Sequence, residues 1–172
     1  MAAVADDRSR PPGPAPRTPP LLDEVDRVLV AELLRDGRAS NAALARAAGI
    51  AESTCVARLR RLRERGILTG VRATVDLARL GLPVQAMVSL RFAGHLRSDV
   101  DTFAREVTGL PGVIAAYNVS GADDFIVHVA TATPEALRDF VLDHLTVRPG
   151  VVHAETSLVF HATPGRRLLP EV

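Results

Sequence analysis

A row of arginines on one predicted helix is the part of this sequence best suited to chemistry. Residues 49–66 read GIAESTCVARLRRLRERG, and Arg58, Arg61 and Arg65 recur there at three- and four-residue intervals. On an α-helix these residues share one face, and each guanidinium is a rigid fork of donors that binds a phosphate or the edge of a guanine. The spacing predicts an outward-facing cationic surface suited to nucleic acid. The alternative is a charged helix face that is only solvated.

The same helix carries an apolar stripe formed by Cys55, Leu59 and Leu62, which must pack on another helix. A short alanine-rich helix precedes it, with Ser40 at its N-cap position and Gly49 where a tight turn between helices would fall. A short capped helix, a glycine turn and a basic helix follow one another in helix-turn-helix order. The sequence therefore predicts this motif over residues 40–65.

One more helix is predicted upstream. Asp23 can cap it, Val25, Leu29 and Leu33 recur at helical spacing, and the pattern ends at Asp36. The net charge of the whole chain is only +1, so any nucleic-acid footprint must come from local arrangement. The helix over 52–65 provides it, because its arginines outnumber its acids.

The second half of the chain changes to the two-residue period of half-buried strands. Two Pro-Gly-Val segments, at 111–113 and 149–151, each end a predicted helix and open a strand. The order is strand-helix-strand-strand-helix-strand (βαββαβ), so we expect an α+β, ferredoxin-like domain. The expected strands cover 84–92, 113–120, 125–130 and 151–160, and the expected helices begin at Ser98 and Thr133.

Such a sheet carries both helices on one face and leaves the other face open. Met87, Val151 and Val159 are expected on the open face, which would then be too apolar to remain in contact with water. We therefore expect a second copy to cover it, giving at least a homodimer. Between the two halves, residues 67–75 read as extended chain, expected to form a strand of a winged or linker region.

A polar turn lies between the second and third predicted strands, in the segment YNVSGADDF at 117–125. Gly121 permits a left-handed backbone, and the groups around it, with Ser120 and Asp124, could hold an ammonium and a carboxylate together. A turn rich in glycine and aspartate is more often only a turn. The residues alone leave both interpretations open.

Together these segments resemble a known family. LLDEVDRVLVAELLRDGRASNAALARAAGIAESTCVARLRRLRERGILTGVRATVDLARLG, residues 21–81, is similar to the DNA-binding half of the Lrp/AsnC (feast/famine) transcription regulators. Gly121, Asp124 and Phe125 match the G-x-x-D-[FY] turn of that family's second domain, the RAM domain, and the segment ETSLV at 155–159 matches its last-strand motif. The resemblance covers residues 21–160.

The resemblance implies a bacterial, cytoplasmic regulator that binds double-stranded DNA and an amino acid or related effector between subunits, as homodimers that can assemble into octamers. The residues themselves predict no cofactor, no metal, no catalysis and no membrane segment. The implied effector site comprises Tyr117, Ser120, Gly121, Asp124 and Thr156. The expected DNA-contacting residues are Ser40, Asn41, Ser53, Thr54, Arg58, Arg60, Arg61 and Arg65. The expected organisation is a disordered proline-rich tail over 1–20, a helix-turn-helix domain over 21–66, a strand and linker over 67–82, the ferredoxin-like domain over 83–162 and a tail over 163–172.

Two departures from the family concern the basic helix. Ala51 offers no capping hydroxyl where the family has a serine, unless Ser53 supplies one. Val56 and Ala57 stand where polar or basic contact residues are common. Base contacts made at those two positions in the family therefore cannot be transferred to this chain.

Other functions find less support in the residues. The single cysteine, Cys55, is interpreted as a small buried hydrophobe, with a redox sensor as the alternative. The five histidines show no pair at metal-binding helical spacing. No apolar run is long enough to span a membrane. The rival functions are an enzyme on the same fold, resembling sirohaem decarboxylases, and an architectural DNA-binding protein without an effector.

Overall fold

The structure, a computed structural model, describes residues 22–94 and 97–163, without the side chains of 97–100. The chain divides after Arg72 into two compact units, and each is described by itself. The tail expected over 1–20, and all but the first residue of the one expected over 163–172, lie outside the described residues.

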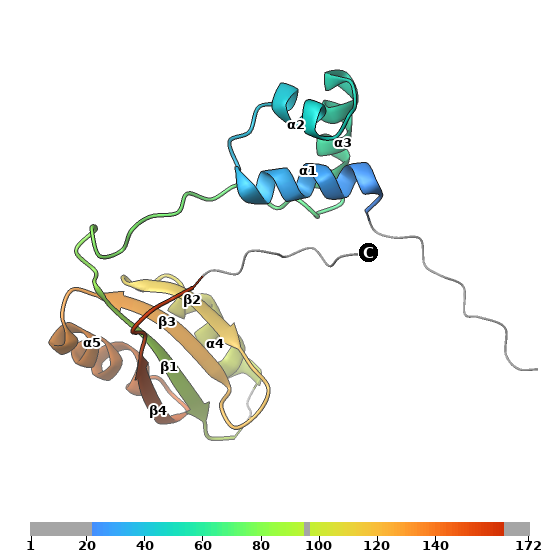
Figure 1. Ribbon diagram of the computed structural model, residues 1–172. Helices are drawn as coiled ribbons and strands as arrows, with labels where there is room; N and C mark the ends of the chain where they lie inside the picture. Colours follow the sequence, from blue (N-terminus) through green and yellow to red (C-terminus); the bar gives the residue numbers. More distant parts are fainter. Residues whose placement is uncertain (1–21, 95–96, 164–172) are drawn as a thin grey trace, which may run out of the picture. The chain divides into compact units, whose positions relative to one another are not determined.

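The first unit consists of three helices: α1 (Glu24–Arg35), α2 (Asn41–Ala47) and α3 (Glu52–Glu64) (Figure 1). All three predicted helices are therefore confirmed. Asp23 caps α1, because its Oδ1 accepts a hydrogen bond from the backbone N–H of Asp26 at 2.8 Å. Leu29 of α1, Leu44 of α2 and Cys55 of α3 meet in one apolar cluster at the centre of the unit.

The strand expected over residues 67–75 is absent, because residues 67–83 form neither helix nor strand. Of the two expectations for this segment, a wing or a linker, the linker is the one that describes residues 67–83. The segment has strand-like alternation, but a strand needs a partner that satisfies its backbone N–H and C=O groups. Among the described residues, no segment of the same chain pairs with residues 67–75.

The second unit is a four-stranded antiparallel sheet with the strand order β2-β3-β1-β4. This order confirms the predicted ferredoxin-like fold. Its helix α4 begins at Arg97, one residue before the expected cap, so Ser98 lies inside the helix. The elements are β1 (Val84–Phe92), α4 (Arg97–Val107), β2 (Val113–Asn118), β3 (Phe125–Thr131), α5 (Pro134–Phe140), η1 (Val141–Thr146) and β4 (Val151–Leu158).

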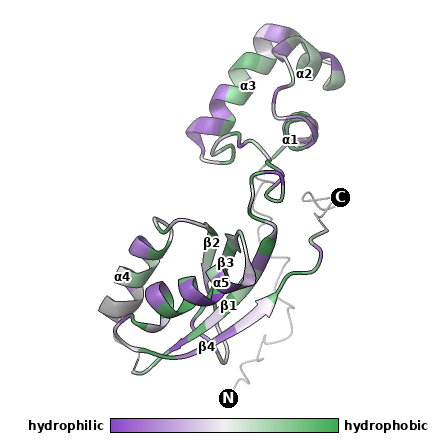
Figure 2. Ribbon diagram, turned by 90° about the vertical axis from the view of Figure 1, so that its left-hand side faces the viewer, coloured by the Kyte–Doolittle hydropathy of each residue, from purple (hydrophilic) through white to green (hydrophobic). Residues whose placement is uncertain are grey.

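The helices cover one face of the sheet (Figure 2). Alternate residues of β1 point into the core there, where Val88 and Leu90 are fully buried. Phe103 of α4 packs against Phe125 of β3 with ring centroids 4.9 Å apart in an edge-to-face arrangement. The core thus holds both helices against the same side.

The helix α5 continues into η1, a π-helical segment that the sequence did not predict. Phe140 and Leu145, five residues apart, are both buried against the sheet. Five residues advance an α-helix by about 140° beyond a full turn, whereas the wider π-helix returns them close to one face. The π-helical segment therefore lets both side chains enter the core.

The other face of the sheet carries the intervening residues, including Met87 of β1 opposite His128 of β3. Met87 and Val159 are half-buried, and Met87 occupies this face as expected. Val151 does not, because it packs on the helix-side core. A bulge between Arg91 and Phe92 shifts the register there and pairs Val151 with Phe92.

Candidate nucleic-acid interface

The turn that leads into α3 sets the position of this helix. Gly49 has a left-handed backbone with φ of 64°, as the predicted tight turn requires. The N-cap residue, Ala51, makes no side-chain hydrogen bond, so the expected lack of a cap is confirmed and Ser53 does not replace it. On the preceding helix, Ser40 Oγ accepts a hydrogen bond from Ala43 N–H at 3.2 Å, which confirms the predicted cap of α2.

The apolar stripe of α3 is buried as predicted. Cys55 and Leu62 are fully buried and Leu59 is 3% exposed. Burial raises the pKa of the Cys55 thiol, because a thiolate would lose its hydration there. Cys55 is therefore an inert packing residue in this fold.

Arg58 is only partly exposed and its guanidinium is bound to α1, which corrects the expectation of a free, outward-facing arginine row. Its Nη1 donates to Asp23 Oδ2 at 2.5 Å and to Asp26 Oδ1 at 2.8 Å, and its side chain is only 24% exposed. Arg61 joins the same cluster, with Nη2 at 3.2 Å from Asp26 Oδ2. Asp26 is 2% exposed, and a carboxylate buried to this degree needs cationic partners. α1 therefore draws Arg58 and Arg61 towards itself.

The charges in this cluster support one another. The hydrogen bond from Arg58 lowers the pKa of Asp23, and the hydrogen bond to Asp23 raises the pKa of the Arg58 guanidinium. Both groups are therefore fully ionised at neutral pH. A phosphate that binds Arg58 must compete with two carboxylates for its donors.

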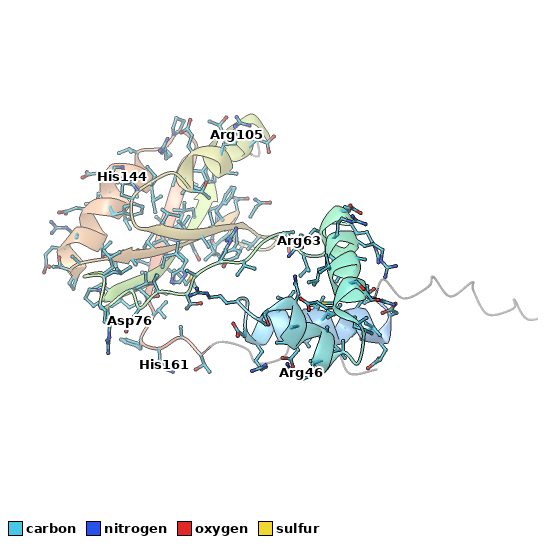
Figure 3. The ribbon with its side chains drawn as sticks, turned by 90° about the horizontal axis from the view of Figure 1, so that it is seen from above. Arg46, Arg63, Asp76, Arg105, His144 and His161 are labelled. Atoms are coloured by element: carbon cyan, nitrogen blue, oxygen red, sulfur yellow. The ribbon has the colours of Figure 1, made fainter. Side chains whose placement is uncertain are left out.

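The outer surface of α3 holds a shallow hollow of about 400 Å³. Arg60 stands at this surface with 75% of its side chain exposed, and its Nε lies 3.7 Å from Glu64 Oε1. An ion pair this exposed contributes little to stability, so a phosphate can readily displace Glu64 from Arg60. Figure 3 shows these helices with their side chains. The hollow is lined by Thr54, Ala57, Arg58, Arg60, Arg61 and Glu64.

The remaining expected DNA-contacting residues also lie at the surface. Ser53 and Arg65 are exposed at the two ends of α3, and Ser40 and Asn41 are exposed at the start of α2. Phosphate contacts made from several such points fix the orientation of a helix in a groove.

In the second unit, the turn between β2 and β3 is held in place by Asp124. Its Oδ2 accepts the backbone N–H of Phe92 at 2.7 Å, and its own N–H donates to Leu90 O at 2.9 Å. Asn118 Nδ2 donates to the carbonyl of Asp124 at 2.9 Å. Asp124 therefore anchors the turn to β1, a structural role that the sequence did not predict.

Arg91, at the end of β1, is a further charged group at this turn that sequence reasoning missed. Its Nε donates to Ala122 O at 2.7 Å, and its Nη2 lies 3.4 Å from Asp123 Oδ1. The available signal was a cation at a polar position of the predicted strand over 84–92. Tyr117, at 51% exposure, Ser120 and Gly121 lie at the surface beside the same turn.

Thr156 lies apart from the other expected effector-binding residues within one chain. It is on β4, at the opposite edge of the sheet from β2, and pairs with Val88 of β1. It borders a groove beside α5 and η1, with Leu137 and Val141 among the lining residues. Within one chain, Thr156 and the turn at Gly121 therefore lie on opposite edge strands of the sheet.

Among the residues that the structure describes, no group of three or more His, Cys, Asp or Glu side chains is arranged to hold a metal ion. In the same residues, no helix is both long enough and apolar enough to cross a membrane.

Two family models match the chain, and each covers one unit. The AsnC-type helix-turn-helix domain matches residues 22–63, and the Lrp/AsnC ligand-binding domain matches residues 85–168. The proteins most similar in sequence include the HTH-type transcriptional regulator AldR of Mycolicibacterium smegmatis, 40% identical over 84% of both chains. AldR of Mycobacterium tuberculosis is 40% identical over 86% of this chain and 82% of its own.

Solved structures agree with these sequence matches. The crystal structure of MtbAldR aligns with a TM-score of 0.74 at 36% identity, over 86% of this chain and 97% of that one. A transcriptional regulator from Neisseria meningitidis, solved as a complex with L-Met, aligns with a TM-score of 0.79 at 26% identity, over 87% and 96% of the two chains. The sequence, the helix-turn-helix unit and the ferredoxin-like unit lead to one conclusion: this chain belongs to the Lrp/AsnC family of transcriptional regulators.

Proposed function

We propose that the protein is cytoplasmic and recognises specific DNA sequences through the outer face of α3. We further propose that an amino acid or related small metabolite controls this DNA binding. The observation that carries the proposal is the exposed, arginine-bearing face of α3 on a helix-turn-helix unit. Family membership supplies the DNA-binding and ligand-binding domains. The effector and the assembly are our own inference.

The proposed docking places α3 in the major groove. Ser53 and Thr54, exposed in its first turn, would enter the groove, while Arg60 and Arg65 would bind phosphates. Arg58 would contribute only where a phosphate displaces Asp23. The complete proposed contact set is Ser40, Asn41, Ser53, Thr54, Arg58, Arg60, Arg61 and Arg65.

The open face of the sheet is the proposed dimer interface. It carries Met87 and Ile126 at half-buried positions and Tyr117 at an exposed one, an apolar surface that a second sheet would cover. A two-fold dimer presents two copies of α3 to half-sites about 34 Å apart, or a multiple of that spacing. Further assembly of dimers into octamers would bring additional surfaces together.

The proposed effector site is the turn between β2 and β3, completed by another copy of the chain. A free amino acid offers an ammonium and a carboxylate, and the Ser120 hydroxyl and the backbone at Gly121 provide partners for both. The L-Met complex of the Neisseria regulator supports an amino-acid ligand for this fold. The effector controls DNA binding only if it binds the assembly states unequally. The proposed site comprises Tyr117, Ser120, Gly121, Asp124 and Thr156.

The direct test is fluorescence anisotropy with the full-length protein and DNA from upstream of its own gene. Binding should exceed that of a shuffled duplex of the same composition, and log K should fall linearly with log salt. Addition of the common amino acids, singly and pooled, should shift the affinity.

Arg60→Ala and Arg138→Ala form a matched pair of variants for this assay. Both side chains are more than 70% exposed, but Arg138 lies on α5 in the other unit. Arg60→Ala should weaken DNA binding and reduce the slope of log K against log salt by about 0.9, the value of one phosphate contact, whereas Arg138→Ala should change neither. Equal binding to shuffled and upstream DNA would argue against this operator, and equal effects of both variants would argue against docking through α3.

A further inference from the structure

The outer surface of α3 contains an apolar strip that packing inside the unit does not explain. Val56 is 47% exposed, whereas the other large apolar residues of the helix, Leu59 and Leu62, are buried. Ala57, the next residue, is exposed and lines the hollow on the outer surface. One exposed valine is ordinary on a protein surface, so what matters is where Val56 lies around the helix.

The helical positions of the strip place it on the proposed reading face. At about 100° per residue, Val56 lies about 100° and Ala57 about 200° around the helix from the buried Cys55. Ser53 and Arg60 fall between these two directions, at about 160° and 140° by the same count. The four side chains therefore form one continuous face turned away from the core of the unit.

The arginines beside this face are committed elsewhere. Arg58 is bound to Asp23 and Asp26, and Arg61 to Asp26. Along the helix axis Val56 and Ala57 lie about one turn after Ser53 and about one turn before Arg60, so this face is apolar between a hydroxyl and a cation. Apolar side chains satisfy no donor or acceptor of any base edge, so they favour an edge that itself carries an apolar group.

In the major groove the C5 methyl group of a pyrimidine is the feature that an apolar side chain contacts favourably. Thymine carries this methyl group, and so does 5-methylcytosine. We infer that Val56 and Ala57 read the C5 methyl group of a pyrimidine, supplied by thymine in the operator, while Arg60 holds the flanking phosphate. The inference rests on the proposed DNA-binding function and assigns specificity to two residues on α3.

The test removes the methyl group and nothing else. The preferred duplex is first selected from a random library by the full-length protein. Each thymine is then replaced singly by deoxyuridine, and affinity is measured by anisotropy. At one or two positions in each half-site, affinity should fall about fourfold, the value of one buried methyl group. Replacing those thymines by cytosine should weaken binding, and 5-methylcytosine there should bind more tightly than cytosine.

Val56→Ala tests whether Val56 causes the loss of affinity on removal of the methyl group. At one of the sensitive positions, this variant should bind the thymine duplex and the deoxyuridine duplex almost equally. Val147→Ala is the matched control: the same substitution at a valine 66% exposed in the second unit, which should keep the fourfold difference. Far-ultraviolet circular dichroism would verify that both variants are folded.

Three results would overturn the inference while leaving DNA binding established. The selected duplex could contain no fixed thymine, deoxyuridine could cost nothing at any position, or Val56→Ala could retain the full sensitivity. Failure to select any duplex over random DNA would instead overturn the proposed function, and the inference with it.

Discussion

Arg58 Nη1 lies 2.8 Å from Asp26 Oδ1, and this contact joins the recognition helix to the first helix of its unit. The side chain of Asp26 is almost completely buried and also receives Arg61. A carboxylate on α1 therefore decides how two arginines of α3 are presented. The charge that a sequence count assigns to the DNA-binding face is partly neutralised within the unit.

Asp23→Asn should strengthen binding to DNA. Asparagine caps a helix as well as aspartate does, so α1 keeps its cap while Arg58 loses one of its two carboxylates. An exposed ion pair is worth about 0–1 kcal/mol, so affinity should rise up to about fivefold at low salt. The slope of log K against log salt should steepen by up to about 0.9, because one more phosphate contact forms.

Glu24→Gln is the control for that variant. Glu24 is exposed in the first turn of the same helix, while the hydrogen bonds of Arg58 go to Asp23 and Asp26. It removes the same charge without releasing Arg58. If both variants changed the salt slope equally, a general loss of negative charge would explain the effect, and competition for Arg58 would be excluded.

Gly112→Ala should destabilise the ferredoxin-like unit. Gly112 has φ of 84°, and a Cβ there would lie 2.7 Å from Ala130 O. The carbonyl of Gly112 itself accepts the backbone N–H of Ala130, which holds the turn close to β3. The left-handed backbone alone costs alanine about 1–2 kcal/mol, and the contact adds to it. Urea unfolding followed by the fluorescence of Tyr117, the single tyrosine of the chain, reports on this unit.

Gly109→Ala is the matched variant, since its Cβ would meet Glu106 O at an ordinary 3.4 Å and its backbone is not left-handed. It should leave the urea midpoint almost unchanged. A midpoint for Gly112→Ala equal to that of Gly109→Ala would contradict the close approach of this turn to β3.

Cys55 should not react with a thiol reagent in the native protein. Its side chain is fully buried and burial raises its pKa, so the reactive thiolate is both inaccessible and scarce. Ellman's reagent should label one thiol per chain in urea above the unfolding midpoint and almost none in buffer. Rapid labelling in buffer, with DNA binding lost at the same rate, would instead support the redox-sensor alternative.

The local features of the helix-turn-helix unit were predictable because each depends on neighbours in sequence. The Asp23 and Ser40 caps, the Gly49 turn and the buried stripe of α3 all follow from spacings of three or four residues. The role of Arg58 did not follow, because its partners lie 32 and 35 residues away. Helical periodicity gives the face of a side chain, not the group that it meets.

In the second unit, alternation identified β1, which has one face buried, and the Pro-Gly-Val segments and the turn at Gly121 placed the other strands. The bulge at Arg91 and Phe92 was not visible, and it turned Val151 to the helix side. The change from α5 to η1 was also hidden, because Val141 and Leu145 fit a helical stripe of either kind. The anchoring role of Asp124 depends on pairing between β1 and β3, which no local pattern specifies.

His128 should make the stability of the sheet depend on pH. Burial lowers the pKa of His128 below the ordinary histidine value of 6.5, and its Nε2 lies 3.1 Å from Gln85 Oε1 on the open face. Below pH 6.5 His128 becomes protonated in the unfolded chain more readily than in the folded sheet, so protonation stabilises the unfolded state relative to the folded state. The contribution of neutral His128 is therefore complete above pH 6.5 and is lost as the pH falls towards its lowered pKa.

The measurement compares urea unfolding of the wild type and His128→Gln between pH 8 and pH 5, followed by Tyr117 fluorescence. Glutamine keeps a donor for Gln85 but does not titrate, so the difference in free energy of unfolding isolates the histidine. The wild type should lose stability relative to the variant as the pH falls below 6.5. Parallel curves over this range would show that His128 ionises as easily in the folded sheet as in the unfolded chain. If the open face is the dimer interface, His128 lies within it, and its protonation would place a charge between the two sheets. Sedimentation velocity should then show less dimer at low pH for the wild type, and no such loss for His128→Gln.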